Sequence, residues 1–340
     1  MKVALVGCGG ISHVHIQGIL DDGRAQLVGV ADIKPERAQK AAQRTGAAAF
    51  TDLDEMLDKA QPDVLHICTP HYLHVPMALN AMGRGIHVLI EKPCAVTVEE
   101  LEELRAAQLK TGLKVGTCFQ NRYNRSAAKL KKILEDKELC GALLGVRGFV
   151  TWNRGEGYYS DDWHGRMKME CGGVAINQSI HTLDMMQYLA GPVKSVKGHV
   201  FNDHLEGKIE VEDTATALLE FENGASGIFY ATTANSVDSP VFAEFICENT
   251  VFRMEGDSLY EVTSDGFEIV KTPPEEEELP GKACWGTGHA SLIKDFYSAI
   301  LEDRPFELDA FEGGNAVEIV LGIYRSSETG KVELTHNVKK

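Results

Sequence analysis

Hydrophobic positions in the first third of the chain occur in short runs that alternate with helical segments. The apolar runs predict strands at residues 2–6, 26–31, 63–68, 86–90 and 114–118. Helices are predicted between them, over Pro35 to Arg44 and over Thr97 to Lys110, where Thr97 and Glu100 form a capping-box pattern. Strands alternating with helices form a parallel sheet. We therefore predict an α/β fold with a doubly wound parallel sheet for residues 1–122.

The apolar pattern changes in the second part of the chain, where longer β-type stretches dominate. They lie at residues 142–151, 193–201, 213–221, 225–233, 241–247 and 250–254, and Glu222-Asn223-Gly224 predicts a hairpin turn between two of them. Helices are predicted at Ala127 to Glu135, Gly173 to Leu189, 289–302 and 313–329. Residues 123–340 are therefore predicted to form a second α/β domain with a large, mostly antiparallel open sheet.

Composition narrows the range of partners. The chain has 340 residues, of which 44% are hydrophobic, and a formal net charge of −16. The acidity argues against a nucleic-acid surface, and no apolar stretch is long enough to span a bilayer, so we expect a cytoplasmic protein that binds small molecules. The eight cysteines form no C-x-x-C pair, so we expect reduced structural thiols and no metal site.

A glycine turn follows the first predicted strand in the pattern of a dinucleotide site. Gly7 permits a tight turn, Gly9 lets the backbone approach a pyrophosphate, and Ser12 is small enough for the following helix to pack closely. Asp32 ends the next strand about 20 residues later, where a carboxylate accepts hydrogen bonds from ribose hydroxyls and repels a 2′-phosphate. The turn also includes Gly10 and Ile11. We therefore expect NAD rather than NADP as cofactor.

Two further segments follow predicted parallel strands. Thr69-Pro70 and the nearby His74 follow the strand at 63–68, and Glu91-Lys92-Pro93 follows the strand at 86–90. Ligands of open α/β sheets bind at the carboxyl ends of the strands. We therefore expect these residues to line the cofactor site, with the Lys92 ammonium directed into the cleft by the extended backbone that precedes Pro93.

The second part of the chain offers candidate substrate contacts. Trp152, Arg154, Tyr158 and Trp163 concentrate aromatic and donor groups that suit a sugar ring, although packing under a loop explains them equally well. Asn177, His181 and Asp184 are predicted to form one polar stripe on the helix over 173–189. His289, at the start of a late helix, is a further candidate.

The chain resembles the Gfo/Idh/MocA oxidoreductases over nearly its whole length. The resemblance rests on the glycine turn at 7–12, Thr69-Pro70, Glu91-Lys92-Pro93, and the segment from Gly172 to His181. It implies a Rossmann domain, NAD chemistry on sugars or cyclitols, and a homo-oligomer, either dimer or tetramer. It also implies that Lys92 lies by the substrate and nicotinamide and that His181 accepts the hydroxyl proton.

The chemistry of alcohol oxidation agrees with these roles. Loss of hydride requires loss of the hydroxyl proton, for which histidine is a suitable base, and a lysine ammonium stabilises the developing alkoxide. Many relatives carry aspartate where this chain has Asn177, so that neighbour does not raise the pKa of His181 by charge. We expect an NAD-dependent dehydrogenase of a ring secondary alcohol. The alternatives are a glycoside-cleaving enzyme with tightly bound NAD and a non-catalytic dinucleotide-binding regulator.

Overall fold

The computed structural model describes residues 1–270 and 288–336, which divide into two compact units. Unit 1 comprises Met1–Cys118 and His289–Gly314, and unit 2 comprises Phe119–Gly288 and Asn315–Lys340. A single boundary at 122 therefore does not separate the units, because the segment 289–314 packs with the first unit. Among the described residues, no helix combines the length and apolar character needed to cross a bilayer.

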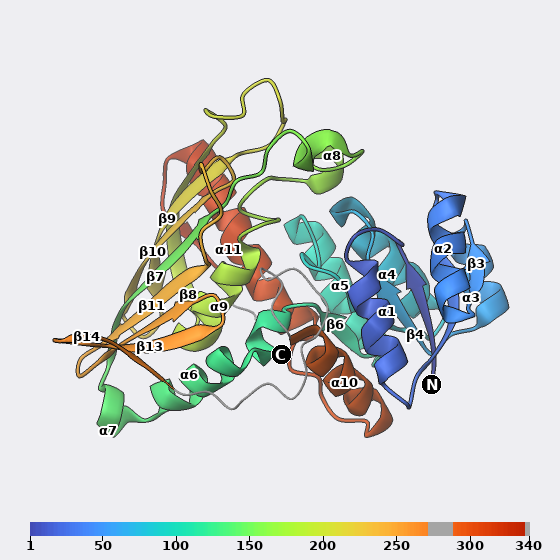
Figure 1. The fold of residues 1–340 in the computed structure, drawn as a ribbon, viewed down its shortest axis with the longest axis horizontal. Coiled ribbons are helices and arrows are strands. Elements are labelled where there is room, and N and C mark those ends of the chain that lie inside the picture. The colour runs from blue at the N-terminus through green and yellow to red at the C-terminus, as the bar shows by residue number, and fades with distance from the viewer. Residues whose placement is uncertain (271–287, 337–340) are drawn as a thin grey trace. The chain divides into compact units, whose positions relative to one another are not determined.

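Unit 1 is built on a six-stranded parallel sheet with the order β3-β2-β1-β4-β5-β6 (Figure 1). Its strands are β1 (Lys2–Val6), β2 (Gln26–Ala31), β3 (Ala48–Phe50), β4 (Val64–Ile67), β5 (His87–Ile90) and β6 (Val115–Thr117). The helices are α1 (Ser12–Asp21), α2 (Pro35–Thr45), α3 (Leu53–Ala60), η1 (His71–Leu73), α4 (His74–Gly83), α5 (Val98–Thr111) and α10 (Gly288–Leu301). The strand order reverses at β1 and β4, so the predicted doubly wound sheet is confirmed.

The central strands of this sheet are buried, which explains their continuous apolar sequence. Val64, Leu65 and Ile67 of β4 are fully buried. The predicted strand positions in this unit match the observed ones, but β3 was missed because its three residues give no periodic signal. The predicted cap of α5 is present, since Thr97 accepts a hydrogen bond from the Glu100 N–H.

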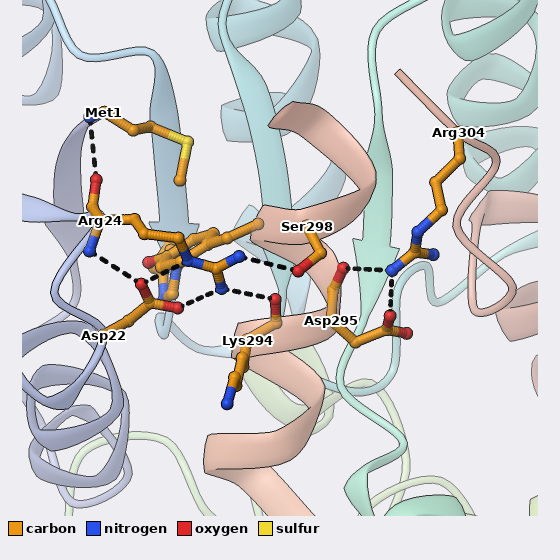
Figure 2. A network of polar contacts seen from close by, with 9 residues as sticks. Met1, Asp22, Arg24, Lys294, Asp295, Ser298 and Arg304 are labelled. Carbon is orange, nitrogen blue, oxygen red and sulfur yellow. Dashed lines mark hydrogen bonds and ion pairs between the residues drawn. The ribbon is translucent and has the colours of Figure 1, made fainter. Parts of the chain in front are cut away.

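Polar contacts connect α10 to the segment between α1 and β2 within unit 1 (Figure 2). The Arg24 guanidinium donates to the Asp22 carboxylate, to Ser298 Oγ at 2.8 Å and to the Lys294 carbonyl at 3.0 Å. The amino group of Met1 donates to the Arg24 carbonyl at 3.0 Å. These contacts explain why a helix so late in the sequence belongs to the first unit.

Unit 2 is built on a nine-stranded sheet with the order β14-β13-β12-β11-β7-β10-β9-β8-β15 (Figure 1). Its strands are β7 (Leu143–Thr151), β8 (Val193–Phe201), β9 (Thr214–Phe221), β10 (Ser226–Thr232), β11 (Phe242–Cys247), β12 (Val251–Glu255), β13 (Ser258–Thr263), β14 (Gly266–Ile269) and β15 (Glu333–Leu334). All neighbouring strands are antiparallel except β7 and β10. The predicted large, mostly antiparallel sheet is confirmed, although β13, β14 and β15 were not predicted.

The helical segments of unit 2 are η2 (Gln120–Tyr123), α6 (Arg125–Glu135), α7 (Lys137–Cys140), η3 (Tyr158–Ser160), α8 (Met167–Glu170), α9 (Ile180–Ala190) and α11 (Ala310–Thr329), whose first residues belong to unit 1. Helix α9 packs on one face of the sheet, against β7 and β11. Two glycines permit close packing on this face: a Cβ at Gly148 would contact Met186 of α9, and one at Gly198 would contact Ile323 of α11. The predicted hairpin is present as well, with Gly224 at φ +86° between β9 and β10.

Candidate active site

The glycine turn between β1 and α1 has the geometry expected of a dinucleotide site. Gly7 has φ +89°, and a Cβ there would lie 2.5 Å from the carbonyl oxygen of Cys68, so both conformation and space require glycine. Around Gly9 and Gly10 a Cβ would meet open space. Ser12 Oγ donates to the Gly9 carbonyl at 2.7 Å and thereby closes the turn. The first amides of α1 face this turn without a side-chain cap from Ile11.

Asp32 is fixed beside the same turn. Its carboxylate accepts the N–H of Cys8 and the N–H of Lys34, each at 2.8 Å, and the residue is 8% exposed. A carboxylate has about four acceptor positions, so both oxygens retain capacity for ribose hydroxyls. The carboxylate is therefore preorganised by the backbone for the predicted role.

His74 braces the two segments that follow β4 and β5. Its ring nitrogens lie 2.8 Å from the Thr69 carbonyl oxygen and 2.7 Å from the Pro93 carbonyl oxygen. Burial lowers the pKa of His74, although the two carbonyls act in the opposite direction. Because backbone carbonyls engage both ring nitrogens, we interpret His74 as a support for the Thr69-Pro70 turn and for the Lys92-Pro93 bond, which is cis.

Glu91 is buried at the end of β5, and half-buried Lys92 follows it. His15 Nε2 lies 2.8 Å from Glu91 Oε1, and His289 Nε2 lies 3.8 Å from the same oxygen. Although burial acts in the opposite direction, the two histidines hold the pKa of Glu91 well below its usual value. Glu91 is thus a buried carboxylate held by histidines, which differs from the predicted direct contact with cofactor.

A pocket of about 830 Å³ lies within unit 2. Four of the predicted substrate-contact residues line it: Trp152, Arg154, Tyr158 and His181. The remaining lining residues are Asn121, Asn124, Asn153, Thr182, Met185, Asp238, Ser239, Pro240, Val241, Ala243, Met254, Glu255, Gly256 and Asp257. The wall therefore combines apolar surface with several hydrogen-bonding groups, which is the usual composition of a small-molecule site.

Arg154 is held in the pocket wall by its neighbours. Its Nη1 lies 3.0 and 3.1 Å from the two carboxylate oxygens of Asp238, and its guanidinium stacks over the Trp152 ring, 4.6 Å from the centroid. The Tyr158 ring is 5.5 Å from the same guanidinium. Although burial acts in the opposite direction, the Asn153 N–H and Arg154 hold the pKa of Asp238 below its usual value. Arg154 thus covers one face of the Trp152 ring, and that face is unavailable to a sugar ring.

His181 lies in the first turn of α9 and lines the pocket. Its ring packs edge-to-face on Phe119, with the centroids 5.6 Å apart. The predicted helix over Gly173 to Leu189 is wrong in its first part, because α9 begins only at Ile180. His181 therefore projects from a helix start.

Asn177 lies in the turn before α9, so the predicted stripe on one helix is wrong at this residue. Its side-chain amide donates to the Glu170 carboxylate, and the residue is 5% exposed. Glu170 is fully buried and also accepts the N–H of Gly165. Asn177 is not among the pocket-lining residues of the described chain, so its predicted substrate contact is not seen in unit 2.

The segment ahead of α9 is organised by Glu212, which the sequence analysis missed. The buried carboxylate accepts the N–H groups of Gly173 at 2.8 Å and Ala175 at 3.0 Å, and the Tyr324 hydroxyl at 2.8 Å. Burial raises the pKa of Glu212, and these three donors act against that rise. A Cβ on Gly173 would lie 2.0 Å from the Glu212 carbonyl oxygen, so the second glycine of this motif has no room for a side chain.

Arg122 and Asp184 form a buried ion pair within unit 2. The distances are 2.9 Å from Nε to Oδ2 and 2.6 Å from Nη2 to Oδ1, and both side chains are at most 3% exposed. The guanidinium also stacks over Tyr188, 4.5 Å from the ring centroid. Asp184 is thus a structural anchor, because this pair fixes α9 against η2.

Two predicted substrate residues lie elsewhere. His289 belongs to unit 1, where it is 4% exposed and next to Glu91. Trp163 packs on His164, with ring centroids 3.8 Å apart, and is not among the residues lining the unit 2 pocket.

Comparisons with known proteins give consistent results for both parts of the chain. Residues 1–119 match a family model described as an oxidoreductase family with an NAD-binding Rossmann fold, and residues 127–253 match the GFO/IDH/MocA C-terminal domain. The chain is 26% identical to D-glucoside 3-dehydrogenase of Escherichia coli (strain K12), covering 98% of this chain and 97% of the relative. It is 26% identical to scyllo-inositol 2-dehydrogenase (NAD(+)) of Bacillus subtilis (strain 168), covering 79% and 80%.

A solved structure is similar along the whole chain. The WlbA dehydrogenase from Bordetella pertussis, in complex with NADH and UDP-GlcNAcA, has a TM-score of 0.86 and 30% sequence identity. The alignment covers 100% of this chain and 99% of that one.

Proposed function

Because this chain belongs to the Gfo/Idh/MocA family of oxidoreductases, we propose that it is an NAD-dependent dehydrogenase that oxidises a ring secondary alcohol of a sugar, glycoside or cyclitol. The observation that carries the proposal is the pocket of unit 2, in which His181 lies among hydrogen-bonding groups. The named relatives that act on glucosides and inositols support this substrate class.

The glycine turn of unit 1 fits NAD. The open space at Gly9 and Gly10 and the amides at the start of α1 suit the pyrophosphate, and Asp32 suits the ribose hydroxyls. When bound, NAD accepts the hydride that leaves the carbinol carbon. The protein must therefore provide the proton acceptor and stabilise the substrate oxygen.

His181 and Lys92 are the groups we assign to these tasks. In the proposed reaction, neutral His181 accepts the hydroxyl proton as the hydride leaves, since the reaction cannot proceed without loss of that proton. The Lys92 ammonium donates a hydrogen bond to the same substrate oxygen and stabilises its developing negative charge. His181 ends as an imidazolium and releases its proton after the ketone forms.

The pocket favours a neutral, hydroxyl-rich ring over an acidic one. Arg154 is the cationic side chain among the described lining residues, and Asp238 already pairs with it. A substrate carboxylate would have to compete with Asp238 for this guanidinium and would also face Glu255. Asn121 and Asn124 offer amides that donate to or accept from hydroxyls.

A substrate panel tests the proposal. Reduction of NAD⁺ is followed at saturating cofactor against hexoses, glycosides, uronates and inositols, and we expect turnover of a neutral member. His181→Ala should lower kcat/KM on the order of 10²–10⁴-fold, as for a positioned acid–base group. Lys92→Ala should abolish turnover with NAD affinity retained. His199→Ala and Lys59→Ala, which alter exposed side chains away from the glycine turn and the pocket, are the controls.

The same experiment separates the alternatives. Cleavage of a glycoside without added NAD would indicate tightly held cofactor and transient oxidation. NAD binding with no turnover of any panel member would favour a regulator. Unchanged rates in both His181→Ala and Lys92→Ala would contradict the assigned roles.

We further propose that the protein forms a homo-oligomer in the cytoplasm. The sheet face opposite α9 exposes Leu218 and Ile228, which pair across β9 and β10, and the adjacent Phe149, Tyr230 and Phe242 line a shallow pocket of about 390 Å³. An exposed apolar face of this kind suits a second copy of the chain. The thiols of Cys8, Cys68, Cys94, Cys118, Cys140 and Cys247 form no disulfide, which suits a reducing compartment.

A further inference from the structure

A continuous line of hydrogen bonds crosses the interior of unit 1 and ends on Glu91. Tyr297 Oη lies 2.9 Å from His66 Nε2, His66 Nδ1 lies 2.9 Å from His15 Nδ1, and His15 Nε2 lies 2.8 Å from Glu91 Oε1. Both histidines are fully buried, and Glu91 is 7% exposed. Four elements supply these groups: α10, β4, α1 and the end of β5.

With both histidines neutral, the contacts permit one consistent assignment of protons. Glu91 as a carboxylate can only accept, so His15 Nε2 carries a proton and donates it. Neutral His15 then has a bare Nδ1, which accepts from the Nδ1–H of His66. His66 in turn has a bare Nε2, which accepts from the Tyr297 hydroxyl. Every donor has an acceptor, and the line carries a single negative charge, located on Glu91.

The electrostatics of the partners agree with this assignment. Burial lowers the pKa of His66 well below its usual value, so this histidine stays neutral. Burial likewise raises the pKa of Tyr297 well above its usual value, so its hydroxyl keeps its proton. His289, the second histidine near Glu91, also has a lowered pKa because of burial.

The line of hydrogen bonds ends at Glu91, which is next to Lys92, the residue that acts on the substrate oxygen in the proposed function. Glu91 precedes Lys92 directly, its N–H donates to the Ile67 carbonyl at 2.9 Å, and the Pro93 carbonyl contacts His74 at 2.7 Å. The backbone on both sides of Lys92 is therefore held. His15 lies one helical turn beyond Ser12, so the same line also joins the glycine turn to the lysine segment.

We propose that His15 and His66 are positioning residues, which hold the Glu91 carboxylate in one orientation and thereby fix Lys92 for its action on the substrate oxygen. The inference about Lys92 rests on the proposed function, whereas the proton assignment does not. Removing a member of the line should affect the rate of the chemical step more than the binding of NAD.

A bound metal ion is the competing explanation of the cluster. Ligand atoms of His15, Glu91 and Cys118 lie within 4.8 Å of one another, and Cys118 Sγ is 3.9 Å from His15 Nε2. However, 2.8 Å between His15 and Glu91 is an ordinary N–H···O distance. Burial also raises the pKa of the Cys118 thiol well above its usual value, and a thiol must be deprotonated to bind a metal. Hydrogen bonding therefore explains the cluster better.

The proton assignment is tested first by NMR on the wild-type protein labelled with ¹⁵N-histidine. We expect His66 as the Nδ1–H tautomer and His15 as the Nε2–H tautomer. Assignment of the resonances uses His15→Gln and His66→Asn. The opposite tautomers, a charged His15–His66 pair, or metal found by elemental analysis at one ion per chain would overturn the proposal, whether or not the protein is a dehydrogenase.

The positioning role is tested with Glu91→Gln and two variants of His66. Glu91→Gln keeps the shape of the side chain and should lower kcat at least about 10-fold, as for loss of about 1.4 kcal/mol of transition-state stabilisation, with the Kd of NADH within twofold of wild type. In His66→Asn the amide nitrogen replaces Nδ1–H, so kcat should exceed that of His66→Ala. Gln17→Ala, on α1 outside the line, is the matched control.

These measurements distinguish the two ways of failing. In the first case the tautomers are as expected, but the wild type turns over no panel substrate. The proposed function then fails, and the positioning role is overturned with it, because the line of hydrogen bonds is only structural. If wild type is active and Glu91→Gln matches its kcat, the positioning role alone is overturned. Equal losses of kcat and NADH affinity in folded Glu91→Gln would indicate general damage to unit 1 and would likewise overturn it.

Discussion

At the scale of single residues, we predict that Asp32 determines which dinucleotide the glycine turn accepts. Its carboxylate is oriented by two backbone N–H groups and is 8% exposed, so a 2′-phosphate would meet a fixed negative charge. A like-charge contact costs several kcal/mol. We therefore predict that NADH binds at least about 10-fold more tightly than NADPH, a ratio that corresponds to about 1.4 kcal/mol. Asp32→Ala should reduce this preference, as measured by fluorescence titration of both cofactors. Asp58→Ala, on α3, is the control, and equal affinities in the wild type would contradict the prediction.

Asn177 provides a second test, because its neutral amide bonds to the buried Glu170 carboxylate. Asn177→Asp places two carboxyl groups together, which raises the pKa of one of them in the folded state above its unfolded value of about 4. The cost is absent below the unfolded pKa and appears as the pH rises through the folded pKa. We predict that the variant is about 1–3 kcal/mol less stable than wild type at pH 8 and closer to it at pH 5.

Urea denaturation at the two pH values measures this difference. Asn177→Ala removes the hydrogen bond without adding a charge, so its loss of stability should depend less on pH. If Asn177→Asp loses no more stability at pH 8 than at pH 5, Glu170 is protonated in the wild type. The same substitution therefore acts on Glu170 as well, because Asn177 bonds to it directly.

The residue scale also shows which site residues were predictable. Gly7, Asp32 and His181 belong to local motifs whose spacing has a physical meaning. Gly7 has a positive φ, Asp32 accepts the Cys8 N–H and His181 lines the pocket, while their roles in binding and catalysis stay predictions. Asp238 and Glu212 lie far along the chain from the groups they contact, Arg154 and Gly173. No local pattern indicates such partners, so only the fold reveals them.

At the scale of elements, α9 depends on its anchor to η2. Asp184→Ala would leave the buried Arg122 guanidinium without its bidentate partner, which typically costs 3–5 kcal/mol. We predict a loss of about that size in the free energy of unfolding measured in urea. The double variant Arg122→Met/Asp184→Leu should recover much of it, because no unpaired charge remains.

The exposed ion pair between Lys59 and Glu55 is the comparison for this prediction. Lys59→Ala should cost at most about 0.5 kcal/mol, since exposed i,i+4 pairs contribute little. If Asp184→Ala and Lys59→Ala have the same small effect, the buried pair is not the anchor of α9.

Element boundaries were predictable where periodicity and caps agree. Strands β7 to β12 and helices α5 and α10 lie close to the expected positions. The start of α9 was not predicted, because the apolar pattern of the helix continues back through residues 174–176, whereas the backbone from Gly173 to Ser179 forms turns. In these turns the Ser179 N–H bonds to the Val174 carbonyl, five residues earlier, instead of keeping the four-residue spacing of an α-helix.

At the scale of the whole molecule, the two units were expected from composition, but their boundaries were not. The segment 289–314 returns to unit 1, where Arg24 and the buried His66 contact α10. A periodic helix pattern does not reveal which domain the helix packs on, since both offer an apolar surface. Folding of unit 1 therefore depends on residues nearly 300 positions apart in sequence, as the contact of Met1 with Arg24 and of Arg24 with Ser298 illustrates.

The sheet of unit 2 gives the prediction for the assembly. Leu218 is 60% exposed and Ile228 is 44% exposed, and the two side chains are opposite each other on β9 and β10. In a symmetric dimer the same face of each copy is buried, so one charge introduced by substitution occurs twice in the interface. We predict that Ile228→Glu converts the wild-type oligomer to a monomer in light scattering coupled to size-exclusion chromatography. Leu109→Glu, which alters an exposed leucine of α5 in unit 1, should leave the oligomer intact. Wild type that elutes with the mass of one chain at micromolar concentration, or an oligomer unaffected by Ile228→Glu, would show that this face does not bind a second copy.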